Sequence, residues 1–546
     1  MEDRTLGYRA PLLWLVMPAA AGLTAGHFAG LDHAAAPLAL ALPTAALALA
    51  VVDRPRIWAA CLSVALFCAG TAAGTLHRNR LSAWEELPPR EAELRLKIER
   101  LFASRDSGRV SGLAEVVSSE VHLADLSGQR LHFSLSAPGP GPGPIRGAVF
   151  QAVGVLTALP KRPPPGSFED YLVAAGMNFR LNRGQLLAEE RSAPAYHRFC
   201  AAAATRFREI LNLGLAGKRP EIAALLRGMM LGEKHEISDE QQAVFMRSGS
   251  MHLFAISGLN IGVIAIALNA LLALGRVTRG PRFVLAATLL WVFVDITGAS
   301  PSAVRAWLMA TFLQAAFVFG RPGNVLAALA ASAAASVAVA PLQVFSASFV
   351  MSYAIVLALL LLGLPLAACW ARRGRLWRDV PEVAWTRGQV IVAAAWTWIS
   401  GALAIGVATS LVSVLTGLQY FQLVTPGALV ANLALIPAAI GVTVAGFASL
   451  LFGLGCLDAA AILANHAAAL VLLLIERALQ VGVEVPGAFL AARYTAPWIG
   501  PAALTTLIAT ILAGYARDWR HAAGSWWPPF AVVLVTLLLG VSYGAD

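Results

Sequence analysis

The sequence carries little charge. Only 13% of its 546 residues are Asp, Glu, Lys or Arg, whereas 58% are hydrophobic. A soluble domain has about 25% charged and about 45–50% apolar residues. The shortage of charge excludes an ordinary soluble enzyme, and the surplus of apolar residues excludes a disordered chain. The composition predicts a polytopic membrane protein.

Cysteine is scarce as well. The five cysteines are scattered, and four of them lie in apolar stretches. They are Cys61, Cys68, Cys200, Cys369 and Cys456. A small secreted domain held together by disulfides has closely spaced cysteines, so that class is excluded. We expect the four in apolar stretches to be small buried side chains.

Motifs for hydrolysis are missing. The His-Glu pair at 235–236 lacks the second histidine of a zinc helix, and the ten histidines do not cluster. The Gly-Lys pair at 217–218 lacks the earlier glycine of a phosphate loop. His252 and Ser257 are five residues apart on one helix, a spacing that keeps their side chains apart. We therefore predict that the chain is not an enzyme and holds no metal or cofactor.

Long apolar runs fill most of the chain. Runs that can cross a bilayer as helices occur at 11–28, 34–52, 57–76, 251–275, 283–298, 303–320, 324–340, 349–369, 389–415, 424–453, 459–476, 496–515 and 529–543. Because glycine and proline between 401 and 453 can break helices, we expect about 11–13 spans. In the first run, Gly22, Gly26 and Gly30 repeat every four residues, which is typical of a helix-packing face.

The basic residues predict the orientation. With the N-terminus inside, the short inner loops hold 15 arginines, and the short outer loops hold only Arg477 and Arg493. Seven acidic residues reduce the inner total to 15 − 7 = +8, which is most of the net charge of +10. Positive inner loops are a general property of membrane proteins. The basicity therefore reflects topology, and we expect 77–199 and the C-terminus outside and the loop 372–387 inside.

Residues 77–199 break the membrane pattern. Alternating apolar and polar residues predict strands at 93–99, 110–117, 129–136 and 147–157. Several short strands in about a hundred residues predict a small barrel or sandwich. The domain has 16 basic and 13 acidic residues, so its charge gives no indication of DNA binding.

The remaining chain divides into three segments. Residues 1–76 form an N-terminal three-helix membrane segment, and 251–546 form a nearly continuous helical bundle. Between them, 200–250 is amphipathic and predicts helices that lie in the membrane interface. Within it, Ser238 and Gln241 fit a capping box.

Polar residues inside spans are costly and tend to be functional. Asp295 and Arg305 flank a tight outer hairpin at 296–302. Arg305 therefore either contacts a ligand or pairs with Asp295 and sets the register of the hairpin. Residues 257–260 (SGLN) interrupt another span, and they either pack helices or line an aqueous path.

Five short motifs occur in order along the chain. They are PGSFEDY at 165–171 with Gly176, GE at 232–233 with MHLFAISGLN at 251–260, TGASPSAVRA at 297–306 with Met309, Pro341 with SASFVMSY at 346–353, and Pro426-Gly427 with Asn432 and Pro437. Together they resemble the ComEC competence family, whose members are inner-membrane channels for DNA uptake in transformation. The resemblance covers nearly the whole chain.

The sequence departs from this family at two points. The family usually ends its central motif in histidine, whereas this chain has Asn260, which keeps the capacity for hydrogen bonding but is less suited than histidine to a proton relay or a metal site. Many members also carry a C-terminal metallo-β-lactamase-like domain. No His-x-His-x-Asp-His run occurs in this sequence, so we expect no intrinsic nuclease.

The resemblance implies a fold, a location and partners. The fold is a polytopic α-helical membrane protein with one inserted extracytoplasmic OB-like β-barrel domain at 77–199. The location is the bacterial inner membrane, with a cytoplasmic N-terminus. The partners are the lipid bilayer, single-stranded DNA, a separate DNA receptor on the outer face and a separate ATP-dependent motor in the cytoplasm. A nuclease, where one takes part, would be a separate protein.

The resemblance also suggests which residues line the channel or contact DNA. We expect these to be His252, Ser257, Gly258, Asn260, Ser302, Arg305, Ser352 and Asn432, with Asp295 as an intramembrane charge partner. Arg305 is the residue we expect to hold a phosphate. Two other functions remain open: a transporter or exporter of another polyanion or small molecule, and a membrane-anchored assembly protein.

Overall fold

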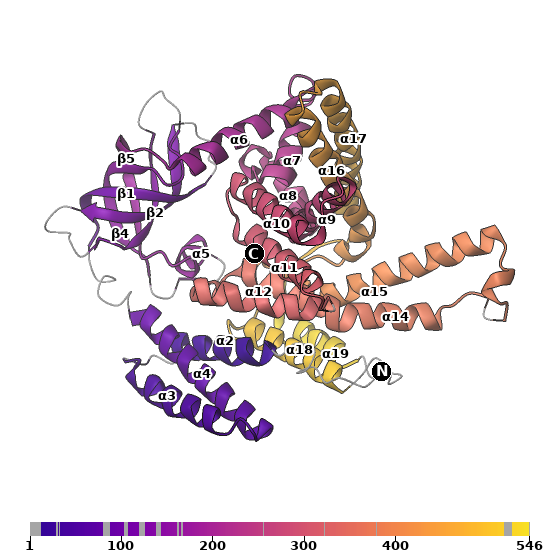
Figure 1. Ribbon diagram of the computed structural model, residues 1–546, viewed down its shortest axis with the longest axis horizontal. Coiled ribbons are helices and arrows are strands. Elements are labelled where there is room, and N and C mark those ends of the chain that lie inside the picture. Colours follow the sequence, from indigo (N-terminus) through magenta and orange to yellow (C-terminus); the bar gives the residue numbers. More distant parts are fainter. Residues whose placement is uncertain are drawn as a thin grey trace.

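The computed structural model describes residues 12–28, 31, 33–79, 88–102, 108–119, 126–137, 143–160, 163–164, 167–254, 256–321, 323–377, 379–517 and 527–544. A β-barrel lies at one end of the molecule, and a helical bundle occupies the centre (Figure 1). A hairpin of two helices projects from the bundle at the end opposite the barrel.

The N-terminal segment contains three helices, α2 (Leu13–Phe28), α3 (Ala35–Ala50) and α4 (Pro55–Asn79). Helices α2 and α4 pack backbone to backbone, because a Cβ atom on Gly22 or Gly26 would collide with the main chain of Phe67 or Thr71. The predicted packing face is thus confirmed for Gly22 and Gly26, and Gly30 lies outside the described residues.

The polar domain is a closed five-stranded barrel with the order β1-β2-β3-β5-β4, in which β1 pairs with β4. Strands β3 and β5 run parallel, and the other neighbours run antiparallel. The strands are β1 (Arg90–Phe102), β2 (Arg109–Ser119), β3 (Arg130–Ser136), β4 (Val149–Ala158) and β5 (Phe179–Arg191). The four predicted strands are confirmed, whereas β5 and the short helix α5 (Phe168–Ala174) before it were not predicted.

Three helices follow the barrel: α6 (Ala195–Asn212), α7 (Pro220–Leu231) and α8 (Asp239–Arg247). The predicted capping box is present at the start of α8, with Ser238 and Gln241 bonded reciprocally. The prediction of interfacial helices is wrong for α7. Every residue of α7 from 222 to 231 is buried, so this helix lies within the protein core.

Each of the 13 apolar runs contains a helix, and a π-turn at Leu359–Gly363 joins two of the helices into one. Proline does not break the run around 437, because α16 continues through Pro437. The helices from 258 onward are α9 (Gly258–Leu274), α10 (Arg279–Ile296), α11 (Pro301–Val318), α12 (Val325–Val339), α13 (Ala347–Ala358), α14 (Leu364–Arg373), α15 (Arg387–Phe421), α16 (Ala428–Leu454), α17 (Asp458–Glu484), α18 (Ile499–Ala516) and α19 (Trp527–Leu539).

The protein is a polytopic helical membrane protein. In the described part of the chain, six helices are long and apolar enough to cross a bilayer, and five shorter apolar helices accompany them. The six are Pro55–Leu76, Ala347–Arg373, Arg387–Phe421, Ala428–Leu454, Asp458–Glu484 and Ile499–Ala516. A total above six remains a prediction.

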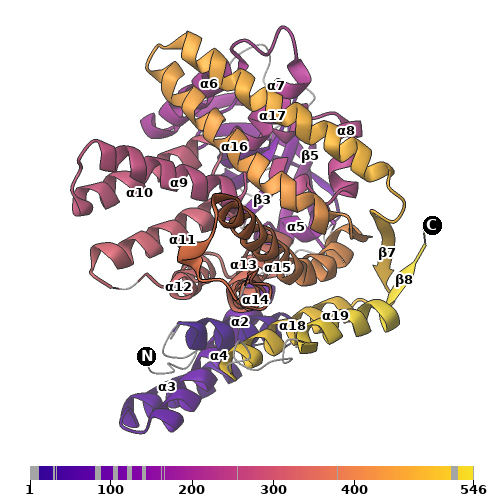
Figure 2. The ribbon, with the colours of Figure 1, turned by 90° about the vertical axis from the view of Figure 1, so that its right-hand side faces the viewer.

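A small sheet, which was not predicted, connects the ends of several bundle helices. It has the order β6-β7-β8, with β6 (Leu423–Val424), β7 (Leu490–Tyr494) and β8 (Val541–Tyr543). In Figure 2, β7 and β8 lie at the right, whereas the turn between α9 and α10 and the turn between α11 and α12 lie at the left.

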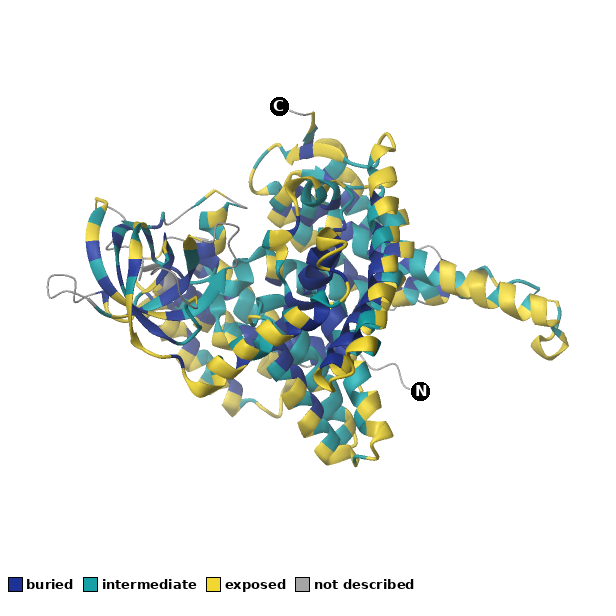
Figure 3. Ribbon diagram, turned by 90° about the horizontal axis from the view of Figure 1, so that it is seen from above, coloured by how far each residue is buried: buried dark blue, intermediate teal, exposed yellow. Residues whose placement is uncertain are grey.

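Burial follows this architecture (Figure 3). Buried residues concentrate in the barrel and in the centre of the bundle, and the projecting hairpin of α14 and α15 is largely exposed. Along α15, Ile391 and Trp398 are among the exposed apolar side chains, which is what a surface in contact with lipid requires. Cys68, Cys200 and Cys369 are buried and Cys61 is half-buried, but the expectation of burial is wrong for Cys456, which is exposed in the turn after α16.

Candidate functional site

Arg305 is a charged side chain inside an apolar helix. It lies on α11 and is only 1% exposed. Its Nη2 atom donates to the carbonyl oxygen of Ser348 at 2.8 Å, to the hydroxyl of the same serine at 2.6 Å and to the hydroxyl of Ser352 at 3.0 Å. Its guanidinium carbon lies 5.9 Å from the centre of the Phe349 ring. Helix α13 therefore supplies all of these contacts.

The guanidinium of Arg305 is only partly satisfied. Its Nε and Nη1 atoms are buried and have no hydrogen-bond partner among the described residues. No described carboxylate forms an ion pair with it. A buried cation without an anion is costly, because burial removes its hydration and nothing replaces it. The site is therefore suited to an anion.

Hydroxyl groups extend this polar region into α12. The hydroxyl of Tyr353 on α13 lies 3.2 Å from the Oγ atoms of Ser332 and Ser336, which are both buried. The Tyr353 ring also packs on Phe349, with 4.5 Å between the ring centres. Together with Arg305, Ser348 and Ser352, these side chains form a polar seam between α11, α12 and α13, which we call the Arg305 seam.

Asp295 does not take part in the Arg305 seam, so the predicted pairing with Arg305 is wrong. Asp295 is buried at the end of α10 and forms an ion pair with Arg146, from the turn before β4 of the barrel. The Tyr196 hydroxyl also donates to Asp295, and burial together with this bond raises the pKa of Tyr196. Gly147 lies directly against His197, where a Cβ atom would collide with the imidazole. These contacts dock the barrel onto the bundle.

Three other predicted residues lie on or beside α11. Ser257 is the N-cap of α9 and accepts a hydrogen bond from the backbone N–H of Asn260 at 3.3 Å. Gly258 is exposed, and a Cβ atom there would lie 3.8 Å from the Cβ of Ala306, next to Arg305 in sequence. Ser302 is half-buried in the first turn of α11. Helix α9 therefore begins at Gly258, next to the helix that carries Arg305.

Asn260 belongs to the core rather than to a lining surface. It is 3% exposed, its Nδ2 donates to the carbonyl oxygen of Met229 at 3.1 Å, and its Oδ1 accepts from the Thr443 hydroxyl at 3.2 Å. The amide thus joins α7, α9 and α16. The expectation that Asn260 contacts DNA is at odds with this position, because both ends of its side chain are engaged within the protein.

His252 and Asn432 lie at a different place. His252 is exposed in the short helix η3 (Met251–Phe254), and its Nδ1 lies 3.0 Å from the carbonyl oxygen of Gly249. Gly249 packs against Thr425, just before α16, and Asn432 is half-buried in the second turn of α16. Among the described residues, no hydrogen bond joins either side chain to the Arg305 seam.

Comparison with known proteins identifies the family. The Competence protein family matches residues 229–517, which is 289 of 546 residues and more than half of the chain. The chain belongs to this family. The ComE operon protein 3 of Bacillus subtilis (strain 168) is 29% identical over 143 residues, which cover 26% of this chain and 18% of that protein. The match thus spans less than a fifth of that relative. No solved structure matches.

The part of the chain that matches the Competence family contains the Arg305 seam but not the barrel.

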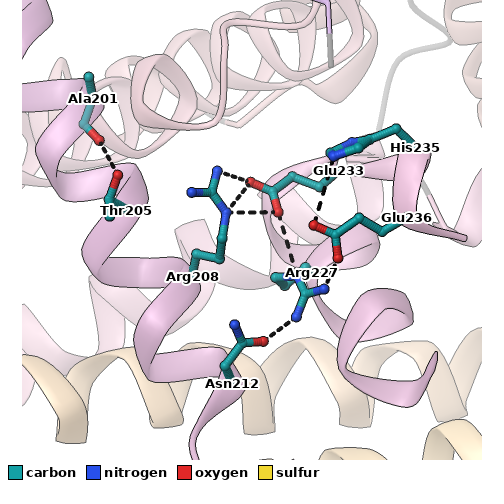
Figure 4. A network of polar contacts seen from close by, with 8 residues as sticks. All are labelled: Ala201, Thr205, Arg208, Asn212, Arg227, Glu233, His235 and Glu236. Atoms are coloured by element: carbon teal, nitrogen blue, oxygen red, sulfur yellow. Dashed lines mark hydrogen bonds and ion pairs between the residues drawn. The ribbon is translucent and has the colours of Figure 1, made fainter. Parts of the chain in front are cut away.

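An ion network that was not predicted lies around residue 229, where the matching part begins (Figure 4). Arg227 of the buried helix α7 contacts Glu233 at 3.6 Å, pairs with Glu236 and donates to Asn212 of α6. Arg208 of α6 donates to Glu233 at 2.6 Å, and this bond raises the pKa of Arg208. The network joins α6, which continues from the barrel, to the core helix α7. An arginine inside the apolar stretch 222–231 was the available signal.

Proposed function

We propose that this competence-family protein is an inner-membrane channel that passes single-stranded DNA into the cytoplasm during natural transformation. The observation that carries the proposal is the buried guanidinium of Arg305, which has hydroxyl partners but no anion. A phosphodiester supplies the missing negative charge. Membership of the Competence family and the similarity to ComE operon protein 3 support a role in DNA uptake.

The Arg305 seam has the chemistry that a nucleic-acid strand needs. A strand in transit requires donors for its phosphates and a path that tolerates any base sequence. The hydroxyls of Ser348 and Ser352 hold one side of the guanidinium, while Nε and Nη1 keep hydrogens to donate. Arginine suits this role because its planar guanidinium stays charged and binds phosphate oxygens.

The rest of the chain has a place in this proposal. The barrel lies on the outer face in this proposal, and its strand order and the parallel pairing of β3 with β5 support an OB-like fold. A receptor outside presents the DNA, and a separate ATP-dependent motor inside pulls it. The chain carries out no hydrolysis itself, and a separate nuclease acts where the second strand is degraded.

Substitution of Arg305 tests the proposal. We expect Arg305→Lys to reduce transformation by roughly tenfold, because lysine keeps the charge but loses the planar donor set. Arg305→Gln should reduce it further. Exposed Arg279 at the start of α10 supplies the control, since Arg279→Gln removes one arginine that is not buried. Uptake of labelled DNA and transformation frequency are measured at equal protein levels.

Thermal unfolding separates function from folding. Because Arg305 is an unpaired buried charge, Arg305→Gln should unfold at the same temperature as the wild type or higher, while its DNA uptake falls. Normal transformation by this variant would exclude a phosphate role. Normal transformation by a strain that lacks the gene and any second copy would exclude DNA as the substrate and leave another polyanion or a small molecule.

A further inference from the structure

The helix α5 exposes aromatic side chains at one end of the barrel. Phe168 is 48% exposed and Tyr171 is 36% exposed. Their rings are stacked, with 6.0 Å between centres and 19° between planes. The Phe102 ring, at the end of β1, lies 6.5 Å from Phe168 and 6.3 Å from Tyr171. Three aromatic rings from two elements therefore form one surface, which we call the α5 platform.

Arginines flank this platform. The guanidinium of Arg100 lies 5.8 Å from the Phe102 ring centre, and its Nη1 lies 3.5 Å from the Tyr171 hydroxyl. The guanidinium of Arg180 lies 6.0 Å from the Phe168 ring centre and is held by Glu169 at 3.2 Å. An arginine thus borders the exposed rings on each of two sides, and Glu169 of the same helix offsets the charge of Arg180.

Packing of α5 onto the barrel does not account for these exposed rings. Leu172 and Val173 of α5 are buried with Met177, Leu113 and Leu159, and this cluster already anchors the helix. Exposed aromatic side chains bordered by cations are unusual on a surface that only needs to be soluble. They suit a ligand with flat apolar faces and negative charge, which describes unpaired nucleotides.

The position of the platform relates it to the Arg305 seam. Helix α5 contacts the short helix η4 (Pro341–Phe345), and Figure 1 shows α5 between the barrel and the bundle. The chain continues from η4 directly into α13, whose Ser348 and Ser352 hold Arg305. A strand on the platform would therefore lie beside the segment that leads to the buried arginine.

We propose that Phe168 and Tyr171, flanked by Arg100 and Arg180, form a site where bases of single-stranded DNA stack before the strand reaches the Arg305 seam. The proposal rests on the proposed function for the identity of the nucleic acid. A single strand is favoured over a duplex because duplex bases are already stacked and present no free faces. The site does not depend on base sequence, since every base has a flat face.

The test uses the full-length protein in detergent and a fluorescein-labelled oligo-dT strand of about 20 nucleotides, with binding measured by anisotropy. The double variant Phe168→Leu with Tyr171→Leu keeps apolar bulk but loses the stacking faces, so the strand should bind roughly tenfold more weakly or worse. Phe168→Trp should bind as the wild type does. Val117→Ala is the control, because Val117 is exposed on β2 of the same barrel.

Three outcomes would overturn the platform. The first is unchanged oligo-dT binding by the double leucine variant at an unchanged unfolding temperature. The second is that the wild-type protein binds a fluorescein-labelled duplex of the same length as tightly as it binds the single strand. The third is that the double leucine variant loses binding to phosphatidylglycerol vesicles while its binding of oligo-dT is unaffected. That result would assign the surface to lipid headgroups instead.

Failure of the platform and failure of the channel give different results. If the double leucine variant loses oligo-dT binding while Arg305→Gln transforms normally, the platform stands and the channel role of Arg305 falls. If both leucine substitutions leave binding intact while Arg305→Gln abolishes uptake, the channel stands and the platform falls.

Discussion

Arg146 and Asp295 form an ion pair across the boundary between the barrel and the bundle, although 149 residues separate them in sequence. The Asp295 side chain is 4% exposed and the Arg146 side chain 39% exposed, so the pair lies at the edge of the core. The Tyr196 hydroxyl bonds to the same carboxylate. Asp295 therefore has its partners at the barrel and α6, and Arg305 has only serine oxygens as partners among the described residues.

Loss of Arg146 should leave the buried Asp295 carboxylate without its cation. We expect Arg146→Gln to lower the free energy of unfolding by roughly 1–3 kcal/mol, because a buried carboxylate loses its cation. Asp295→Asn in the same chain should recover most of this loss, since it removes the unpaired charge. Thermal unfolding of the purified protein measures both effects. In contrast, Asp295→Asn should not restore transformation to Arg305→Gln, and restoration would show that the two residues act as a pair.

The helices were predictable because each apolar run is long, and four strands were predictable from alternation. Strand β5 was missed for a local reason. Its sequence alternates from Phe179 to Leu181 and then bulges at Arg183, which has a positive φ of 52°, so the pattern breaks in the middle. The burial of α7 was missed because Glu221 and Arg227 gave the segment an amphipathic composition, although Arg227 is neutralised inside the protein.

The candidate site was only partly predictable, because its contacts are tertiary. The sequence places Arg305 in a span, and Ser352, one of the predicted site residues, does contact it in the fold. The partner of Asp295 lies in another domain, so no local pattern could indicate it. Asn260 resembled a lining residue because it follows a glycine break, yet the fold turns it toward Met229 and Thr443.

The barrel should lose stability in acid because of His132. This histidine is 4% exposed, and burial, with a smaller effect of the Arg180 charge, lowers its pKa to about 4. The pKa in the unfolded chain is about 6.5, so the unfolded state binds the proton more tightly. The contribution of His132 to stability should be constant above about pH 6.5 and should fall as the pH drops toward 4. Unfolding temperatures of the wild type and of His132→Leu across this range measure the effect, and equal slopes for the two proteins would contradict it.

The contact between α2 and α4 should depend on Gly26. A Cβ atom there would collide with the Thr71 backbone, which cannot move like a side-chain tip. We expect Gly26→Ala to lower the free energy of unfolding by about 1–3 kcal/mol through overpacking. Gly441 in α16 is the matched control, since a Cβ atom there meets nothing within 4 Å. Thermal unfolding in detergent compares the two, and equal effects would show that close packing at Gly26 is unimportant.

Reporter fusions test the proposed orientation. An alkaline phosphatase fusion after Arg198, at the start of α6, should be active if the barrel lies outside. A fusion at Gly374, after the arginines at the end of α14, should be silent because positive loops stay inside. Arg378, which belongs to the same loop, lies outside the described residues. The opposite pattern of activity would reverse the orientation and the direction of uptake.

Asn260 should act through stability rather than through contact with DNA. Asn260→Ala removes the donor to the Met229 carbonyl and the acceptor of the Thr443 hydroxyl, and we expect it to lower the free energy of unfolding by about 1–3 kcal/mol. Thr443→Val removes only one of these bonds. Because the two residues share a hydrogen bond, the double variant should lose less stability than the two single losses added together. Thermal unfolding of the four proteins gives this coupling. If Asn260→Ala instead unfolds normally and transforms poorly, the residue touches the strand and the structural role proposed for it is wrong.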